Sequence, residues 1–131
     1  MFLSNLVVSP MTGTRNTFRL KEDLIYKLSN GMAMVIPKGF VYDGASIPYI
    51  LTNILPRFGY KYDRASCLHD WLYAATNTHN YNRKECDKVF YEAMLSDKVN
   101  KNLAKLIYLA VRVFGSKYYG GNIVIKDSYG D

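Results

Sequence analysis

The sequence predicts a single α+β domain, with a small N-terminal antiparallel β-sheet followed by a C-terminal bundle of three to four helices. The length of 131 residues suits one domain. Asn30-Gly31 lies between two apolar runs, which is the pattern of a tight hairpin. Later in the chain, apolar residues recur at spacings of three and four, which is the helical period. We therefore expect a β-rich part (1–45), a helical part (46–115) and a Gly- and Tyr-rich surface tail (116–131).

The predicted hairpin pairs residues 23–28 (DLIYKL) with residues 32–36 (MAMVI) around Asn30-Gly31. Pro37 ends the second arm, because proline lacks the N–H that a strand ladder needs. The segment that follows, from Gly39 to Ser46, contains two glycines and is expected to form a loop. Two weaker strand candidates are residues 4–8 and 17–20.

The helical part begins with a short predicted helix. Ser46 is a suitable N-cap for it, with Pro48 in the first turn, and the helix is expected to end near Leu55. A proline and a glycine then interrupt the chain. Asp63 is a suitable N-cap for a second helix over residues 63–76.

Two further helices are expected. Asn82, with Glu85 three residues later, resembles a capping box at the start of the third helix. A fourth helix over residues 101–114 is followed by Gly115, where a C-cap glycine belongs. The expected apolar stripe of this fourth helix consists of Leu103, Leu106, Ile107, Ala110, Val111 and Phe114.

Composition excludes several classes of protein. A hydrophobic fraction of 49% with 21% charged residues excludes intrinsic disorder as the default state. No apolar run approaches about 18 residues, so no transmembrane helix is expected. The N-terminal segment MFLSNLVVSPM lacks the basic region of a signal peptide. Cys67 and Cys86 do not form a disulfide framework, and with two histidines at unpaired spacings they predict no zinc site. We expect reduced thiols in a cytosolic setting.

The net charge of +6 is compatible with a phosphate-bearing partner, either nucleic acid or an anionic membrane. The basic residues are spread thinly along the chain, however. The densest group is Lys98, Lys101 and Lys105, which is typical of the solvated face of a helix. Charge alone therefore does not favour nucleic acid as a partner.

The segment His69-Asp70-Trp71-Leu72-Tyr73 carries the main candidate chemistry. His69 and Tyr73 are four residues apart, so they share a face of the second helix, and flanking leucines turn that face toward the core. A buried imidazole needs a polar partner on at least one nitrogen. Asp87 on the third helix is the candidate, because antiparallel helices joined by a short connection bring such residues together. A carboxylate on one imidazole nitrogen leaves the other nitrogen able to take a proton from water, which describes a general-base dyad.

Each of these residues also has a structural interpretation. A histidine on a helix face can serve packing alone, and Tyr73 can belong to the core. Asp87 can pair with Arg83, one turn earlier on the same helix. Asp70 can form an ion pair with a basic residue near the start of its helix, either Lys61 or Arg64.

The segment Asp43-Gly44-Ala45-Ser46 is a candidate cation loop. Gly44 is able to adopt a positive φ angle, which exposes backbone carbonyls beside the Asp43 carboxylate. Such oxygens suit a hard cation such as calcium, and Asp70 is a further carboxylate. The alternative is a tight turn in which Ser46 caps the following helix.

Several segments taken together resemble a phage-associated family, the domain of unknown function 1353. They are VIPKGF (35–40), DGASIP (43–48) and HDWLY (69–73), in that order, and DKVFYEAM (87–94) and YLAVRVFG (108–115) fit as well. The resemblance covers roughly residues 18–119. It implies a gene carried by bacteriophages or prophages, often near tail or lysis genes, and it implies no particular activity.

A more distant resemblance is to secreted phospholipase A2. His69-Asp70 with Tyr73 three residues after the aspartate, then Asp87 and Phe90 on the next helix, is similar to the pattern of those enzymes. The chain departs from the animal enzymes in having no disulfide framework, fewer loop glycines and a strand-rich first third. The resemblance implies that His69 is the general base, that Asp87 orients it and that Tyr73 supports the network. It also implies that calcium, held by Asp70 and loop carbonyls around Asp43 and Gly44, polarises an ester carbonyl.

The expected function is therefore a calcium-assisted lipid or ester hydrolase of a bacteriophage, acting on host membrane phospholipid during lysis or entry. The alternative is a non-catalytic phage structural or accessory protein, associated with tail or neck, in which the His-Asp helix is a core element. That alternative predicts that His69 is buried with no opening. A third possibility is a small effector that binds a host protein or nucleic acid. The expected location is the host cytoplasm during infection, or the virion.

Overall fold

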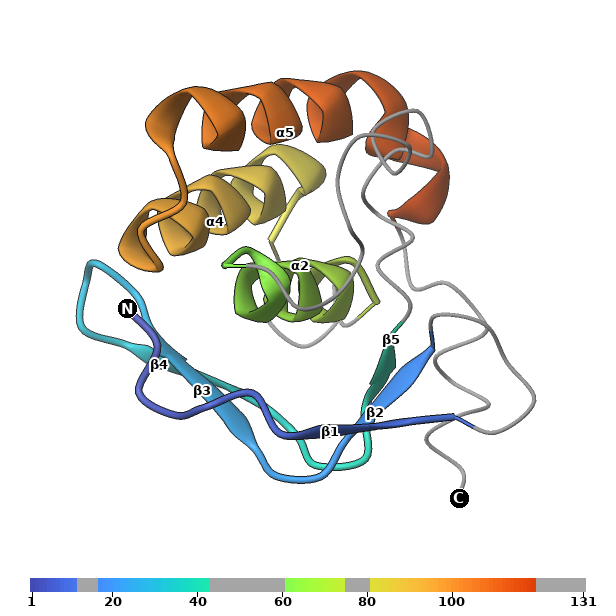
Figure 1. The fold of residues 1–131 in the computed structure, drawn as a ribbon. Helices are drawn as coiled ribbons and strands as arrows, with labels where there is room; N and C mark the ends of the chain where they lie inside the picture. The colour runs from blue at the N-terminus through green and yellow to red at the C-terminus, as the bar shows by residue number, and fades with distance from the viewer. Residues whose placement is uncertain (12–16, 43–60, 75–80, 120–131) are drawn as a thin grey trace.

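Two small antiparallel sheets lie on one side of three stacked helices in the computed structural model, which describes residues 1–11, 17–42, 61–74 and 81–119 (Figure 1). Helix α2 lies between the sheets and α4, and α5 packs on the far side of α4. The α+β class is confirmed. The strands come first along the chain, and three of the expected helices follow.

The hairpin forms as predicted. Strand β3 (Leu24–Lys27) pairs antiparallel with β4 (Ala33–Ile36), with Leu24 opposite Ile36. The turn between them places Gly31 at a φ of 90°, which favours glycine. The side chain of Asn30 accepts a hydrogen bond from the backbone N–H of Met32 at 2.9 Å, so the turn is closed by its own side chain.

The second sheet differs from the expectation. Strands β1 (Val8–Pro10), β2 (Phe18–Leu20) and β5 (Val41–Tyr42) form a three-stranded antiparallel sheet in the order β1-β2-β5. The first strand therefore begins where the expected strand 4–8 ends. The expected loop contains a two-residue strand, because Val41 and Tyr42 are buried and pair with Arg19 and Phe18. The strand part is thus two sheets rather than one.

The described helices are α2 (Asp63–Ala74), α4 (Arg83–Ser96) and α5 (Lys101–Phe114), with a 3-10 turn, η1 (Gly115–Tyr118), after α5. The capping box at the start of α4 is confirmed, since Asn82 and Glu85 exchange both of its hydrogen bonds. The N-cap of α5 is Asn100, whose side chain accepts from two backbone N–H groups. Gly115 is the C-cap of α5, but its φ of −79° is helical rather than left-handed.

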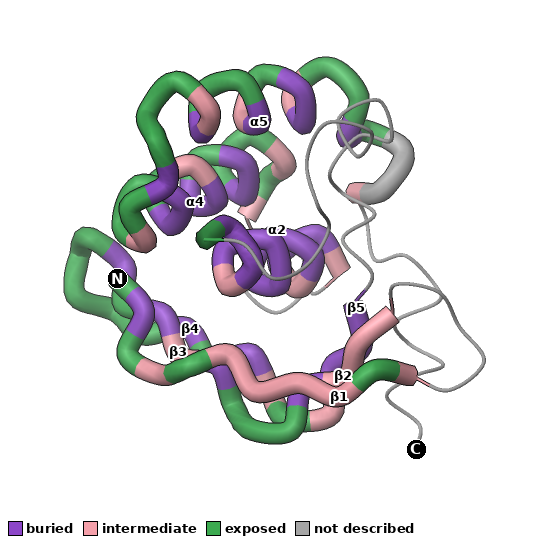
Figure 2. Tube along the Cα trace, in the orientation of Figure 1, coloured by how far each residue is buried: buried purple, intermediate pink, exposed green. Residues whose placement is uncertain are grey.

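The core lies between the sheets and α2 and continues between the helices (Figure 2). The apolar stripe expected on α5 needs a correction, because Leu106 and Phe114 are 51% and 52% exposed. Helix α5 packs mainly against α4, so one side of the helix is covered and a wide apolar stripe is only partly buried. Across the described residues, no helix combines the length and the apolar character that a membrane crossing requires.

Some expectations fall outside the described residues. They are the short helix from Ser46 to Leu55, the loop residues Asp43 and Gly44, the end of the second helix beyond Ala74, and the tail from residue 120 onward. Both cysteines lie within the described part, where Cys67 and Cys86 are free and buried.

Candidate active site

The structure brings His69 and Asp87 into direct contact in the core between two helices. Helix α2 supplies His69 and α4 supplies Asp87, and both side chains are 0% exposed. The distance from His69 Nε2 to Asp87 Oδ1 is 2.7 Å, which is a hydrogen bond. The two helices pack against each other after a short connection, so the contact predicted from the helical pattern is present.

Asp87 accepts hydrogen bonds from two further side chains. The hydroxyl of Tyr73, one turn after His69 on α2, donates to Oδ1 at 2.5 Å. Arg112 on α5 donates from Nη1 to Oδ2 at 2.7 Å. The carboxylate on α4 is therefore held by side chains from α2 and α5, and hydrogen bonds to an ionised group are the stronger kind.

Burial and partners together set the charge states of the pair. Burial lowers the pKa of His69 below its ordinary value of 6.5, and the attraction of Asp87 offsets this only in part. Burial pushes the pKa of Asp87 upward, but hydrogen bonds from His69, Tyr73 and Arg112 outweigh it and hold that pKa below its ordinary value. At neutral pH the site therefore holds a neutral imidazole beside an ionised carboxylate.

These charge states fix the tautomer of His69. An ionised Asp87 only accepts hydrogen bonds, so the proton of the neutral ring is on Nε2. The other nitrogen, Nδ1, then carries a lone pair. This atom is buried, and it has no hydrogen-bond partner among the residues that the structure describes.

Aromatic rings hold the imidazole plane in place. Phe90 on α4 stacks on the ring of His69, with the ring centres 4.3 Å apart and the planes 19° apart. Tyr73 packs against the same ring at 4.2 Å. The ring of Tyr119 meets that of Tyr73 edge-on, with ring centres 5.4 Å apart. The hydroxyl of Tyr119 donates a hydrogen bond to the backbone carbonyl of Tyr81 at 2.6 Å. The orientation of the imidazole is therefore set by packing as well as by Asp87.

The pairing of Asp87 with Arg83 that the sequence left open is not formed. Arg83 instead donates to the backbone carbonyls of Val111 and Arg112, near the end of α5. The carbonyl of Val111 also accepts from the backbone N–H of Gly115, the C-cap of α5, so the arginine adds a charged donor at the end of this helix. Arg83 thereby ties the start of α4 to the end of α5, next to the residue that does reach Asp87.

Asp70 is described, but the rest of the candidate cation site is not. Asp70 is 6% exposed. Burial raises the pKa of both Cys67 and Tyr42, and the charge of Asp70 adds to this. Its suggested partner Arg64 forms an ion pair with Asp97 instead, with Nη2 2.5 Å from Oδ1. Within the described residues no three His, Cys, Asp or Glu side chains are grouped so as to hold a metal. Among the proposed calcium ligands, Asp70 therefore lies within the described residues, whereas Asp43 and Gly44 lie outside them.

Arg112 was not among the residues predicted from the sequence to belong to the site. A buried carboxylate needs a cation or several donors, and Arg83 lies on the same helix at the spacing that favours an ion pair. Arg112 is 25 residues away in sequence and reaches Asp87 through the packing of α5 on α4. The signal in the sequence was a basic residue in the last turn of a predicted helix, where it also favours the helix dipole.

Thiol chemistry does not fit this site. Burial raises the pKa of the Cys86 thiol to about 12 and raises that of Cys67 as well. A reactive cysteine needs a lowered pKa and some access to solvent. Because the two thiols stay protonated and buried, His69 with Asp87 is better suited to proton transfer than either cysteine.

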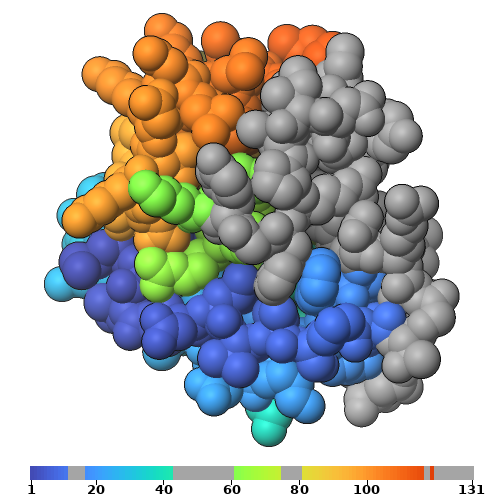
Figure 3. Space-filling view, viewed as in Figure 1, coloured from blue at the N-terminus to red at the C-terminus, as the bar shows by residue number. Residues whose placement is uncertain are grey.

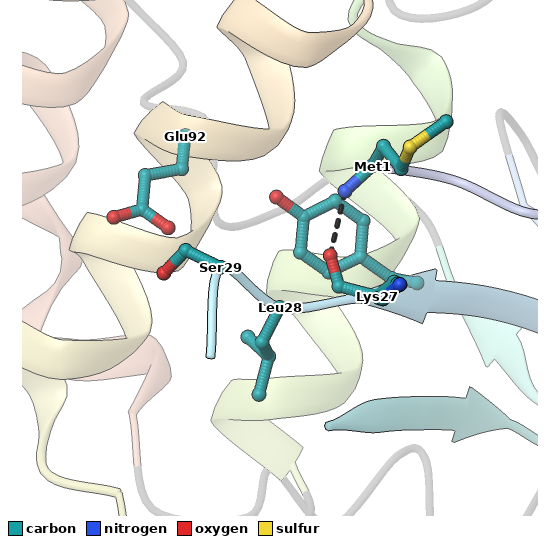
Figure 4. Close-up of a pocket in the computed structure, with 6 residues that line it drawn as sticks. Met1, Lys27, Leu28, Ser29 and Glu92 are labelled. Carbon is teal, nitrogen blue, oxygen red and sulfur yellow. Dashed lines mark hydrogen bonds between the residues drawn. The ribbon is translucent and has the colours of Figure 1, made fainter. Parts of the chain in front are cut away.

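A separate hollow of about 390 Å³ lies between the β3–β4 hairpin and α4 (Figure 4). Figure 4 shows Glu92 on α4 facing Ser29 on the hairpin. The amino group of Met1 donates to the carbonyl of Lys27 at 2.6 Å on the same side. None of His69, Tyr73 or Asp87 lines this hollow, so it is distinct from the candidate site.

Comparison with known families agrees with the segments noted in the sequence. The family described as "Protein of unknown function (DUF1353)" matches residues 18–111. The chain belongs to this family. The match includes His69, Tyr73 and Asp87 and ends one residue before Arg112.

Relatives from Sinorhizobium fredii (strain NBRC 101917 / NGR234) match the same part of the chain. "Uncharacterized protein y4iH" is 36% identical over 100 residues, which cover 76% of this chain and 41% of that protein. "Uncharacterized protein y4jT" is 31% identical over 102 residues, which cover 77% of this chain and 30% of that protein. The chain thus spans less than half the length of either relative. No solved structure matches the chain.

Proposed function

We propose that this protein is a hydrolase in which His69 is the general base and Asp87 orients it. The observation that carries the proposal is the state of the imidazole. Its Nε2 is bonded to an ionised carboxylate at 2.7 Å, while its Nδ1 has a lone pair and no partner among the described residues. A histidine that serves packing alone gains nothing from a buried, unbonded nitrogen, because leaving such an atom unsatisfied costs free energy.

The proposed proton transfer uses the residues already in place. Nδ1 of His69 takes a proton from a water molecule as the water oxygen bonds to the ester carbonyl carbon. When the ester C–O bond breaks, the imidazolium gives that proton to the leaving alcohol oxygen. The imidazolium that forms is stabilised by the charge of Asp87, which stays ionised throughout. Tyr73 and Arg112 keep the carboxylate in position, since both donate to it and neither has to move.

The substrate we propose is an ester of a host membrane phospholipid, and the setting is bacteriophage lysis or entry. The support is the similarity of the His69-Asp70 and Tyr73 spacing to phospholipase A2, together with the net charge of +6, which suits an anionic lipid. Calcium would be held by Asp70 and by carbonyls around Asp43 and Gly44. When bound there, it would polarise the ester carbonyl.

The test is release of fatty acid from phosphatidylglycerol vesicles, with calcium and with a chelator. The variant is His69→Gln, because glutamine keeps an N–H donor for Asp87 but has no basic nitrogen. We expect calcium-dependent release by the wild type and a loss of about a hundredfold or more in His69→Gln. Thermal unfolding of both proteins shows whether the variant remains folded.

The chain offers a matched control in its other histidine. His79→Gln makes the same chemical change in a polar stretch of sequence, and we expect it to keep full activity. Absence of release from folded wild type would refute the lipid hydrolase. Equal loss in both histidine variants would refute the role of His69.

A second candidate function has an observation in its favour. The side chain of His69 is 0% exposed, as expected if the His-Asp helix is a core element of a non-catalytic phage structural or accessory protein. In that case Asp87 and its three donors serve to hold the helices together.

The two candidates differ in what they predict for virions. A tail or neck component remains with purified phage particles after density-gradient separation, and an immunoblot with antibody against the chain detects it there. A chain found in particles and lacking esterase activity would favour the structural role. A chain absent from particles would contradict it.

A further inference from the structure

The outer side of α5 carries an exposed apolar row. Leu106, Leu109 and Val113 are spaced three and four residues apart, so they share one face of the helix. Their exposed fractions are 51%, 50% and 68%. In Figure 2 the exposed stretches of α5 lie on its side away from α4, and in Figure 3 the atoms of α5 form an outer edge of the molecule. Exposed apolar residues grouped in this way mark a contact surface.

A basic row runs beside the apolar row. At 3.6 residues per turn, Lys101, Lys105 and Arg112 point in directions within about 40° of one another, next to Leu109. Lys101 and Lys105 are exposed. The charge of Arg112 is paired with Asp87 of α4, whereas the helix contains no aspartate or glutamate that could neutralise Lys101 and Lys105. An amphipathic helix with exposed leucines and valine beside lysines is the pattern of an interfacial membrane helix.

We propose that this face, formed by Leu106, Leu109, Val113, Lys101 and Lys105, docks on an anionic phospholipid surface. The apolar row enters the boundary between headgroups and acyl chains, and the two ammonium groups lie among the lipid phosphates. This inference rests on the proposed function, which supplies phospholipid as the substrate. It extends that function by stating that the protein meets this lipid in a bilayer rather than as dissolved molecules.

The charge pattern favours lipid over a second copy of the chain. In a two-fold pairing of α5 with itself, the same patch lies on both sides of the interface. Whichever way the two helices run, the lysines of each copy would then meet no carboxylate on the partner's helix. An anionic bilayer supplies the opposite charge along the whole row.

The docking face is also connected to the candidate site through a single helix. Arg112, in the last turn of α5, donates to Asp87 at 2.7 Å. The proposed lipid-binding surface and the residue that holds the orienting carboxylate therefore belong to one helix. Docking through α5 sets the candidate site at a fixed position relative to the bilayer.

The experiment is co-sedimentation of the wild-type protein with vesicles of ether-linked phosphatidylglycerol and phosphatidylcholine in equal parts. Ether-linked lipids have no ester bond to cleave, so binding is measured without hydrolysis. We expect binding to these vesicles, weaker binding at high salt, and at least about tenfold weaker binding to phosphatidylcholine alone. Absence of binding to the anionic vesicles would overturn the proposal.

Two sets of variants test the face itself. Replacing Leu106, Leu109 and Val113 by glutamine, a good helix former, is expected to weaken binding by about tenfold or more. The control replaces Met32 and Val35, which are exposed on the β3–β4 hairpin, by glutamine. Lys101→Glu with Lys105→Glu is expected to remove the preference for anionic lipid. Lys21→Glu with Lys38→Glu, exposed in the strand part, gives the same change in charge as a control.

The outcomes separate this inference from the proposed function. Binding through α5 without fatty-acid release from ester lipid refutes the hydrolase and keeps the docking face. Hydrolysis of a soluble short-chain ester without vesicle binding refutes the docking face and keeps the hydrolase. Unchanged binding in the glutamine variant overturns the inference, as does a wild-type dimer in sedimentation that this variant converts to monomer.

Discussion

The hydroxyl oxygen of Tyr73 lies 2.9 Å from the position that a Cβ atom on Gly115 would occupy. Gly115 has a helical φ of −79°, so the backbone there does not require glycine. The space does require it, because the same hydroxyl donates to Asp87 at 2.5 Å. The residue that follows α5 thus leaves room for one of the donors of the candidate site.

Gly115→Ala is expected to destabilise the protein by about 1–2 kcal/mol, because the new methyl group displaces the Tyr73 hydroxyl. In a helical conformation, replacing glycine by alanine would on its own raise stability. A lower free energy of unfolding in Gly115→Ala would therefore come from the clash. In a Tyr73→Phe background the nearest ring carbon is 3.6 Å away, and the same substitution should be nearly neutral. Urea unfolding of the four proteins measures this, and an equal cost in both backgrounds would contradict it.

Asp87→Asn is expected to lower the free energy of unfolding by about 3 kcal/mol, because it leaves Arg112 without its buried counter-charge. A comparison is Asp97→Asn, which removes the charge partner of Arg64. The two arginines are similarly exposed, at 31% and 29%, but Asp87 is fully buried and also accepts from His69 and Tyr73. Among the described residues, the side chain of Asp97 accepts from Arg64, so the cost there should be about 1 kcal/mol. Denaturant titration of both variants provides the measurement. If Asp87→Asn lost less unfolding free energy than Asp97→Asn, the prediction that the Asp87 carboxylate contributes more to stability would be wrong.

Stability should fall as pH falls below about 6.5, the pKa of an exposed histidine. The pKa of His69 is lowered in the folded protein, so the unfolded chain takes up this proton first. The stability that His69 contributes is therefore fully present above the unfolded pKa and is lost as pH falls toward the folded pKa. The pKa of Asp87 is also lowered from 3.8, which adds a second loss in more acidic solution.

The measurement is urea unfolding at a series of pH values from about 8 to 5, a range that brackets the ordinary histidine pKa. His69→Gln should remove the first decline and leave the rest of the profile unchanged. A decline of the same size in the variant would mean that another group causes it.

Arg112 is predicted to keep the pKa of His69 low. It neutralises part of the Asp87 charge that His69 faces, so Arg112→Gln should raise that pKa, because the imidazolium then meets an uncompensated carboxylate. Arg112→Lys keeps the charge and should keep the pKa closer to that of the wild type. Titration of the His69 ring protons by NMR follows this without any activity assay. If the protein is a hydrolase, the acid limb of its pH–rate profile should move to higher pH in Arg112→Gln, and an unmoved pKa would contradict the role.

Local signals in the sequence were sufficient for several elements. The Asn30-Gly31 turn and the Asn82–Glu85 capping box each depend on residues within a few positions of one another. The contact between His69 and Asp87 was also predictable, because consecutive antiparallel helices with a short connection place such residues together.

Other features depend on packing that no local pattern encodes. The two-residue strand β5 is too short for a period to be visible and forms because β2 provides a partner. The spacing of Leu106 and Phe114 predicts a helix, but which residues are covered depends on how many elements pack against it. Arg112 reaches Asp87 from another helix, so only the docking of α5 reveals the pair.

Asp87 on α4 accepts hydrogen bonds from side chains of α2 and α5. We therefore expect the three helices to fold and unfold together. Moving either neighbouring helix away removes at least one donor from a buried charge, so partial opening is costly. Amide hydrogens in α2, α4 and α5 should therefore exchange with solvent as one cooperative unit. A protease cut between α4 and α5 would then disable the candidate site by loosening the helix that supplies Arg112 to Asp87.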